Sequence, residues 1–352
     1  MEPKKRLHPS QLPFERTDRR YGSTVRFAGA QIPVTKQVSR NIIEIKEAID
    51  YAAEVEADYL VTPEAALSGY YEDFMNTQEQ YQELLAAEHE VVTYARSKSV
   101  GLCLGTLFMN TEEHGQLKRN QIRFFDKEGN FISAYNKIQT ISQDNVVPGV
   151  FCNVNTKQTE NHLWTGHPIV ELKKDQFTTF ETSALICNDM YGEDSEGQAI
   201  ARRALYQLRS CEDPLTFIIH PTFGLRGTEV IEGHQHPKHG GAVYLEEEMT
   251  SIRTTMEDWT RTHLEMLSYQ MNMSFLVVDT CSDFSGEISK FKTSSPSGVV
   301  SKGIWVTKVD PYGKQYFHHD FAVHAKITST GGESMLSRIT ALEKTNPTPV
   351  EE

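Results

Sequence analysis

The chain has 352 residues, of which 38% are hydrophobic, and its 35 basic and 48 acidic side chains give a formal charge of −13. This length exceeds the usual domain of roughly 100–200 residues, but the low apolar fraction favours polar loops added to one core over a second domain. The acidic balance argues against nucleic-acid and membrane-surface partners. No run approaches the roughly 18 apolar residues that cross a bilayer, and the start lacks an apolar leader, so we expect a soluble, cytoplasmic protein.

Residues 1–24 are rich in Lys, Arg and Pro without apolar periodicity, which predicts an arm that is disordered or lies across another surface. A buried strand is expected over 25–32. A helix follows in which isoleucines recur at helical spacing, with Ser39 as a candidate N-cap. Further elements continue the alternation: a strand at 58–63, a helix at about 77–97, a strand at 100–107, and a hairpin of strands near 120–126 and 131–136.

The second half repeats this style without repeating the sequence. It predicts strands at 178–187, 215–220 and 274–280 and helices at about 194–209 and 254–271. The alternation indicates the α/β class, and one mixed sheet with helices on its faces would satisfy it. The surplus length lies in segments 148–168 and 224–250 and in a polar tail at 326–352. We therefore expect one folded domain over 25–325.

Reactive side chains follow three of the predicted strands. Glu64 follows the strand that ends at Pro63, Lys137 follows 131–135, and Cys187 closes 183–186. In α/β folds ligands bind beyond the carboxyl ends of strands. A cation lowers the pKa of a neighbouring thiol, and a carboxylate accepts its proton, so these groups together would activate a nucleophile for acyl transfer from a carbonyl or nitrile. Backbone N–H groups after the cysteine, beginning with Asn188, would stabilise the oxyanion if the chain turns sharply there.

Each residue alone also has an ordinary interpretation. The five cysteines are odd in number and widely spaced, which signals neither a disulfide framework nor a cysteine-ligated zinc site, and a free cysteine is usually a core thiol. Glu64 and Lys137 could equally be solvated surface residues. The sequence around the three residues favours the functional interpretation.

Thr62-Pro-Glu-Ala-Ala-Leu-Ser-Gly-Tyr70, Tyr135-Asn-Lys-Ile-Gln139 and Leu185-Ile-Cys-Asn-Asp189 resemble the three signature segments of the nitrilase superfamily, the carbon–nitrogen hydrolases, in the same order. The resemblance extends over about 25–325. It implies an αββα sandwich that associates as αββα-αββα, with Cys187 as nucleophile, Glu64 as general base and acid, and Lys137 as stabiliser of the tetrahedral intermediate. It implies no cofactor and no metal, and a homodimer or higher homo-oligomer.

The resemblance also suggests a further acidic residue between the lysine and a Pro-Gly pair, and Asp144 stands there. Asp is one methylene shorter than the family's usual Glu, so Asp144 either tunes Lys137 and positions substrate or caps a loop. The Asn after Cys187 is closer to the amidase and carbamoylase branches than to nitrilases. A linear amide or ureido C–N bond is therefore expected, with a nitrile as the alternative. Tyr191 and Phe223 suggest an aromatic-lined substrate pocket, or are ordinary partly buried rings.

Two other features leave alternatives open. His234, His236 and His239 form a cluster with spacing that can bind zinc, but it lies in the long segment 224–250 and on no recognisable strand, so a solvated or substrate-gating loop is preferred over a zinc hydrolase. In 254–271, a stripe of Trp259, His263, Met266 and Gln270 is either core or an oligomer interface. A catalytically silent interaction protein, or an amidase subunit that supplies ammonia to a partner enzyme, remains the alternative from another class.

Overall fold

The computed structural model describes residues 20–69, 77–112, 115–138, 169–175, 178–191, 217–222, 261–281, 296–309 and 313–327. The larger of its two sheets has eight strands in the order β5-β4-β3-β2-β1-β12-β7-β6. Their bounds are β1 Arg20–Gln31, β2 Tyr59–Val61, β3 Gly101–Glu112, β4 Gly115–Phe125, β5 Phe131–Asn136, β6 Val170–Lys173, β7 Thr178–Thr182 and β12 Gln315–Ile327.

The smaller sheet has four strands in the order β11-β10-β9-β8. These are β8 Phe217–Pro221, β9 Ser274–Val278, β10 Gly298–Ser301 and β11 Ile304–Lys308. The helices are α1 Val38–Glu54, α2 Gln78–Ser97, α3 Asn188–Tyr191, the π-helix η3 Arg261–Glu265 and α6 Met266–Met271. None of the helices in these described ranges is long and apolar enough to cross a membrane.

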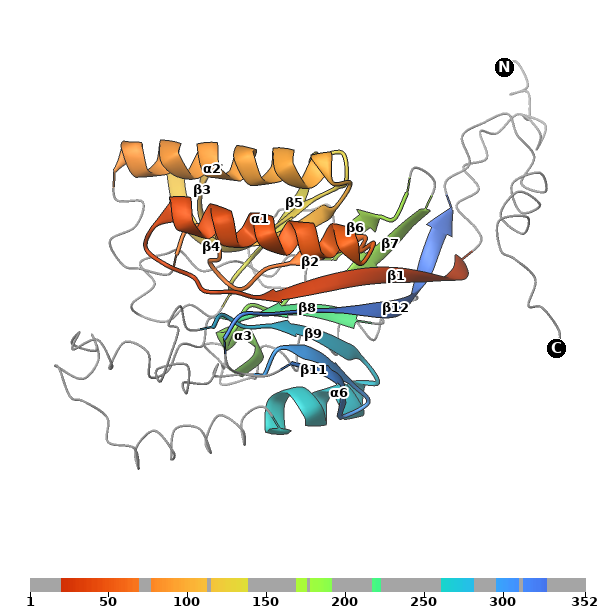
Figure 1. Ribbon diagram of the computed structural model, residues 1–352. Helices are drawn as coiled ribbons and strands as arrows, with labels where there is room; N and C mark the ends of the chain where they lie inside the picture. Colours follow the sequence, from red (N-terminus) through yellow and green to blue (C-terminus); the bar gives the residue numbers. More distant parts are fainter. Residues whose placement is uncertain are drawn as a thin grey trace, which may run out of the picture.

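The elements stack as an αββα sandwich (Figure 1). Helices α1 and α2 cover the outer face of the large sheet, the small sheet lies on its inner face, and α6 covers the small sheet from the other side. Strand β1 shows how the sequence produces two cores. Its Phe27 points between the sheets, whereas the neighbouring Ala28 and Ala30 pack against α1 with Ile45. Phe27 and Ala28 face opposite sides because side chains alternate along a strand. The small residues on the outer face let the helix approach closely.

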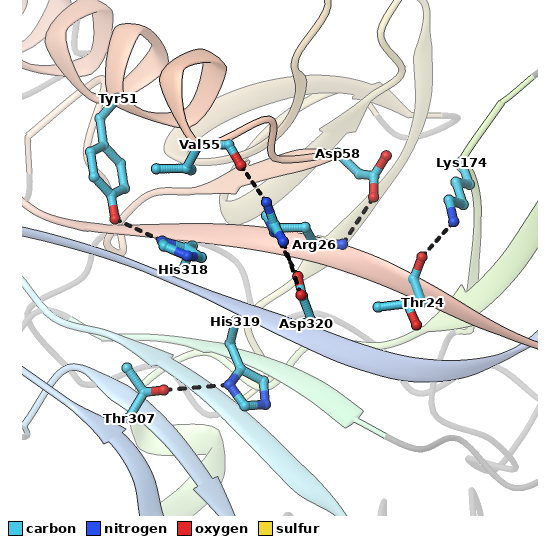
Figure 2. Close-up of polar contacts among 10 residues, drawn as sticks. All are labelled: Thr24, Arg26, Tyr51, Val55, Asp58, Lys174, Thr307, His318, His319 and Asp320. Carbon is cyan, nitrogen blue, oxygen red and sulfur yellow. Dashed lines mark hydrogen bonds and ion pairs between the residues drawn. The ribbon is translucent and has the colours of Figure 1, made fainter. Parts of the chain in front are cut away.

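Strands β1 and β12 form the long antiparallel centre of the large sheet, and a polar cluster on the outer face supports them (Figure 2). Arg26 and Asp320 are cross-strand partners, and the guanidinium Nε lies 2.6 Å from the Asp320 Oδ1. Arg26 also donates to the carbonyl oxygen of Val55 at the end of α1, and its backbone N–H donates to Asp58. Both members of the ion pair are partly exposed, so their contribution to stability is small. The cluster joins β1 to β12 and to the end of α1.

Two of the predicted elements agree with the structure, and two predictions are wrong. The helix at 77–97 is confirmed as α2, and Thr77 and Gln80 form its capping box. The expected hairpin is confirmed as β4 and β5. Ser39 as N-cap is wrong: α1 begins at Val38, and the N-cap residue Gln37 makes no side-chain cap bond. The single mixed sheet is also wrong, because the apolar residues of both halves face each other and separate into two sheets.

The expected stripe on helix 254–271 is only partly described, and it is not core. Met266 and Gln270 are exposed and His263 is half-buried, whereas Leu264, Leu267 and Met271 face the small sheet. The π-helical turn η3 precedes α6. A wider turn changes the residue spacing along one face, so a stripe drawn at 3.6 residues per turn does not predict the buried side here.

Candidate active site

The carboxyl ends of β2 and β5 lie at the same edge of the large sheet. Strand β2 runs parallel to β3, and β3 and β5 are both antiparallel to the intervening β4, so β2 and β5 have the same direction. Glu64 follows β2 and Lys137 follows β5, as predicted. Topology therefore brings together two residues that are 73 positions apart in sequence.

The Glu64 turn, residues 62–69, is anchored to strand β3. The hydroxyl of Thr62 accepts from the Gly105 N–H at 2.9 Å, and the hydroxyl of Ser68 accepts from the Leu107 N–H at 2.8 Å. The Leu67 N–H donates to the carbonyl oxygen of Gly105. A Cβ at position 105 would lie 1.9 Å from the Pro63 carbonyl oxygen, so only glycine allows this close approach.

Glu64 and Lys137 form a buried ion pair. Each is about 99% buried, and the Lys137 Nζ lies 2.7 Å from the Glu64 Oε1. Asn120 of β4 donates from Nδ2 to the same oxygen at 2.7 Å, and its backbone carbonyl accepts from the Lys137 N–H. A buried charge is costly unless it is paired and hydrogen-bonded, and this arrangement supplies both conditions.

The second oxygen of the carboxylate is different. Glu64 Oε2 is buried and has no hydrogen-bond partner among the described residues. Both donors converge on Oε1, so Oε2 is the atom that can accept a proton or a donor from a bound molecule. An acceptor left without a donor in a buried site points to binding or catalysis, because structural carboxylates normally satisfy both oxygens.

Cys187 lies in a sharp turn between the small sheet and α3. The expected strand 178–187 is wrong in its second half: β7 ends at Thr182, and Ala184 bridges to Ile219 of β8 in the other sheet. Cys187 donates its N–H to the carbonyl oxygen of Pro221 at 2.9 Å, and its φ is 44°. A non-glycine residue in this left-handed region is strained, and such a turn between strand and helix exposes the side chain at its tip.

Asp189 connects the Cys187 turn with the Lys137 segment. Its carboxylate is fully buried and accepts the Tyr135 hydroxyl at 2.7 Å, the Ile138 N–H at 3.0 Å and the Ile186 N–H at 3.1 Å. Burial, and then the Asp189 charge, raise the pKa of Tyr135 far above its usual value, so the phenol remains a donor. One carboxylate thus holds residues on both sides of Lys137 against the residue before Cys187.

His220 supports the same turn from β8. It is fully buried, and its Nδ1 lies 2.7 Å from the carbonyl oxygen of Leu185. Burial lowers its pKa to about 4, despite the opposing effect of the Leu185 carbonyl, so the imidazole is neutral near pH 7. A neutral ring with its proton on Nδ1 donates to this carbonyl oxygen, and protonation of His220 would place a charge in a fully buried position.

The described cysteines differ in their surroundings. Cys103 and Cys281 are buried, and burial raises the pKa of the Cys103 thiol well above its ordinary value. These two fit the default of an inert core thiol. Cys187 is only half-buried. Cys152 and Cys211 lie outside the described residues.

Several expected site residues are not described. Asp144, Phe223 and the cluster of His234, His236 and His239 lie outside the described residues. For Asn188 and Tyr191, the first and last residues of α3, the backbone is described but not the side chain. Within the described ranges, no three His, Cys, Asp or Glu side chains are grouped so as to hold a metal ion.

Asn120 and Asp189 are the residues at this site that the sequence did not single out for a role. Asn120 meets Glu64 across 56 positions, and Asp189 meets Tyr135 across 54. Asp189 lies in the motif segment that contains Cys187, and this position could have indicated a role for it. Asn120 had none, because its contact depends on the pairing of β4 with both β3 and β5.

Comparison with known proteins agrees with this geometry. A sequence profile described as carbon-nitrogen hydrolase matches residues 24–193. An amidase from Nesterenkonia sp. superposes with a TM-score of 0.54 at 18% identity, covering 85% of this chain and 90% of that one. A carbon-nitrogen hydrolase from Helicobacter pylori G27 gives 0.59 at 13%, covering 84% and 88%. A search of curated protein sequences gave no match.

The matched profile includes Glu64, Lys137 and Cys187, and both solved structures share the sandwich. The three signature segments, the profile and the fold therefore agree. The chain therefore carries a carbon–nitrogen hydrolase domain of the nitrilase superfamily, matched over residues 24–193.

Proposed function

We propose that the protein hydrolyses a linear, non-peptide C–N bond, in an amide or N-carbamoyl compound, through a thioacyl-enzyme at Cys187. The observation that carries this proposal is the buried Glu64–Lys137 pair, whose segment is tied through Asp189 to the Cys187 turn. Glu64 supplies a base, Lys137 a cation and Cys187 a thiol, which are the groups that acyl transfer requires. The reaction needs no cofactor.

In the first half-reaction, Glu64 accepts the thiol proton at Oε2 and the Cys187 sulfur attacks the carbonyl carbon. A C–S bond forms, and the carbonyl oxygen takes the negative charge. Lys137 and the backbone N–H of Asn188 are the donors for that oxygen, since the Cys187 N–H is already bonded to Pro221. The C–N bond then breaks as Glu64 returns the proton to the nitrogen, and ammonia or an amine leaves.

In the second half-reaction, Glu64 takes a proton from water while the water oxygen attacks the thioester carbon. The C–S bond breaks, the acid product forms, and the proton returns to the Cys187 sulfur. The same carboxylate thus serves twice as base and twice as acid. A carboxylate whose Oε1 is held by two donors keeps a constant orientation through both steps.

A solved relative supports a nucleophilic cysteine on this fold. The Nesterenkonia amidase carries, in one variant, the acetamide moiety of fluoroacetamide on its active-site cysteine, and another variant was solved with acrylamide. These structures share 17% identity with the chain, so they support the proposal by fold. In our proposal Asp144 acts near Lys137, and Tyr191 and Phe223 line the acyl pocket.

The test is replacement of the nucleophile. Cys187→Ala should abolish amide turnover and remove the acyl adduct from the intact-protein mass spectrum. Cys103→Ala is the matched control, because the Cys103 thiol is a buried core group. This variant should retain amide turnover and the acyl adduct. Turnover or an adduct in the Cys187→Ala protein would contradict the proposed role. Ammonia release from a nitrile, but from no amide or carbamoyl compound, would favour the nitrilase alternative.

We also propose that two copies of the chain pair. Large apolar side chains are exposed on α6, at Met266 and Tyr269, and on β11, at Ile304 and Val306. Such residues are unfavourable in water and favour association. Sedimentation should show at least a dimer, and a Tyr269→Glu variant should dissociate. A wild-type protein that sediments only as a monomer would contradict this.

A further inference from the structure

Two buried acceptors without donors lie on neighbouring groups in the site. The first is Glu64 Oε2, described above. The second is Asn120 Oδ1, which is also buried and has no hydrogen-bond partner among the described residues. The two groups are in direct contact, because Asn120 Nδ2 donates to Glu64 Oε1 at 2.7 Å. In each side chain, one polar atom is therefore hydrogen-bonded within the protein, and the other is an acceptor that a bound molecule can use.

This pattern is unusual for a folded protein. Asn120 and Glu64 are each about 99% buried, so water does not solvate the two oxygens as it would at the surface. A buried acceptor without a donor is unfavourable, and the site recovers that free energy only when a molecule brings N–H or O–H groups to it. Lys137 and Asn120 already fix the carboxylate through Oε1, so both oxygens are held in place before a ligand arrives.

We propose that Glu64 Oε2 and Asn120 Oδ1 together receive the two N–H groups of an unsubstituted –NH₂. The substrate would then be a primary amide or a terminal ureido compound, and Asn120 would be a specificity-determining residue. This inference rests on the proposed function and narrows it. A nitrile nitrogen has no hydrogen and is itself an acceptor, so it faces two oxygens unfavourably. An N-alkyl amide carries a single N–H and leaves one acceptor unsatisfied.

The same arrangement has a consequence for the leaving group. When Glu64 protonates the nitrogen, the products of C–N cleavage are the thioester and ammonia, and ammonia retains N–H groups for both oxygens. An ester of the same acid offers no N–H at this position. Amide and ester share the acyl half, so the ratio of their rates isolates the contacts of the –NH₂ group.

The experiment compares kcat/KM for four compounds with one acyl group: the primary amide, its N-methyl amide, the methyl ester and the nitrile. The acyl group is the one that the wild-type enzyme hydrolyses best. In Asn120→Ala, the amide-to-ester ratio should fall roughly ten- to a hundredfold, because one substrate N–H loses its acceptor. Asn120→Gln, which keeps both an amide donor and an acceptor oxygen, should retain more of the ratio and serves if the Ala variant does not fold.

Ser268→Ala is the control for loss of a buried polar group elsewhere. Its hydroxyl donates to the Met273 carbonyl in the α6 layer, and the variant should leave the ratio unchanged. If Asn120→Ala lowers amide and ester rates equally, Asn120 only positions Glu64 and the inference is wrong. If the wild-type enzyme prefers the N-methyl amide or the nitrile, the inference is also wrong. Absence of any turnover and of any Cys187 adduct would instead contradict the proposed function itself, and the inference with it.

Discussion

The turns that carry Glu64 and Cys187 look alike locally but are held in different ways. Each follows a buried β segment, and each contains a non-glycine residue at positive φ, Ala65 at 54° and Cys187 at 44°. The Glu64 turn is anchored to the neighbouring strand β3 by several separate hydrogen bonds, and Asn41 of α1 donates to its Leu67 carbonyl oxygen. The Cys187 turn is hydrogen-bonded to β8 of the small sheet. Through the Asp189 carboxylate it is also connected to the segment after β5 of the large sheet.

The two turns differ in how many independent contacts hold each of them. Contacts of the Glu64 turn are spread over β3 and α1, so no single side chain decides its position, but the backbone approach at Gly105 does. Contacts of the Cys187 turn join separate layers and converge on Asp189 and His220. We therefore expect the base to tolerate side-chain changes around it and the nucleophile to be sensitive to them. Four changes test this contrast.

Gly105→Ala should have the largest effect. Its Cβ would meet the Pro63 carbonyl oxygen at 1.9 Å, and backbone cannot move aside as a side chain can. We expect a loss of about 3 kcal/mol in the free energy of unfolding and at least about a hundredfold in kcat/KM, because Glu64 is displaced. Gly101→Ala is the control on the same strand, since its Cβ meets the Tyr59 ring. It should lower stability but keep activity per folded molecule.

Acid should weaken the Cys187 side through His220. The folded pKa of about 4 is below the ordinary 6.5, so below pH 6.5 the unfolded chain binds a proton that the folded protein does not. Stability conferred by the neutral ring is therefore complete above pH 6.5 and falls toward pH 4, by about 3 kcal/mol. Denaturant titrations of wild type and His220→Gln should converge in this range as the wild type loses more stability. Parallel pH curves for the two proteins would refute the assignment.

Asp189→Asn should detach the nucleophile turn from the Lys137 segment. The amide keeps one acceptor oxygen, and its NH₂ then faces groups that are donors, so about 2 kcal/mol of stability and roughly tenfold in kcat should be lost. Alkylation of Cys187 by iodoacetamide should slow as well. Tyr135→Phe removes only one of the three donors and should cost about 1 kcal/mol. Equal effects of the two variants would argue against a special role for the carboxylate.

Ser68→Ala should have the smallest effect. It removes the acceptor for the Leu107 N–H but leaves the Thr62 and Leu67 ties of the Glu64 turn intact. The free energy of unfolding should fall by about 1 kcal/mol, and kcat/KM should stay within about threefold of wild type. A loss of activity as large as that of Asp189→Asn would mean that the two turns are equally fragile.

Much of the fold could be predicted because its signals are local. The capping box at Thr77 and the alternation in the β4–β5 hairpin depend on neighbours within a few positions, and both elements were found as expected. The course of the chain after Thr182 could not be predicted in this way. Residues 178–187 are uniformly compatible with one strand, and only the pairing of Ala184 with Ile219 shows where the chain changes sheets.

The sequence by itself determined the residue types at the strand ends, Glu64, Lys137 and Cys187, and the family to which they belong, because short motifs and strand periodicity are properties of contiguous segments. Only the tertiary structure decided which atoms meet. It placed Asn120 on Glu64 and Asp189 between the Lys137 and Cys187 segments, through contacts that span more than fifty residues. Such contacts depend on strand order and sheet packing, and no local pattern encodes a hydrogen bond between side chains of separate strands.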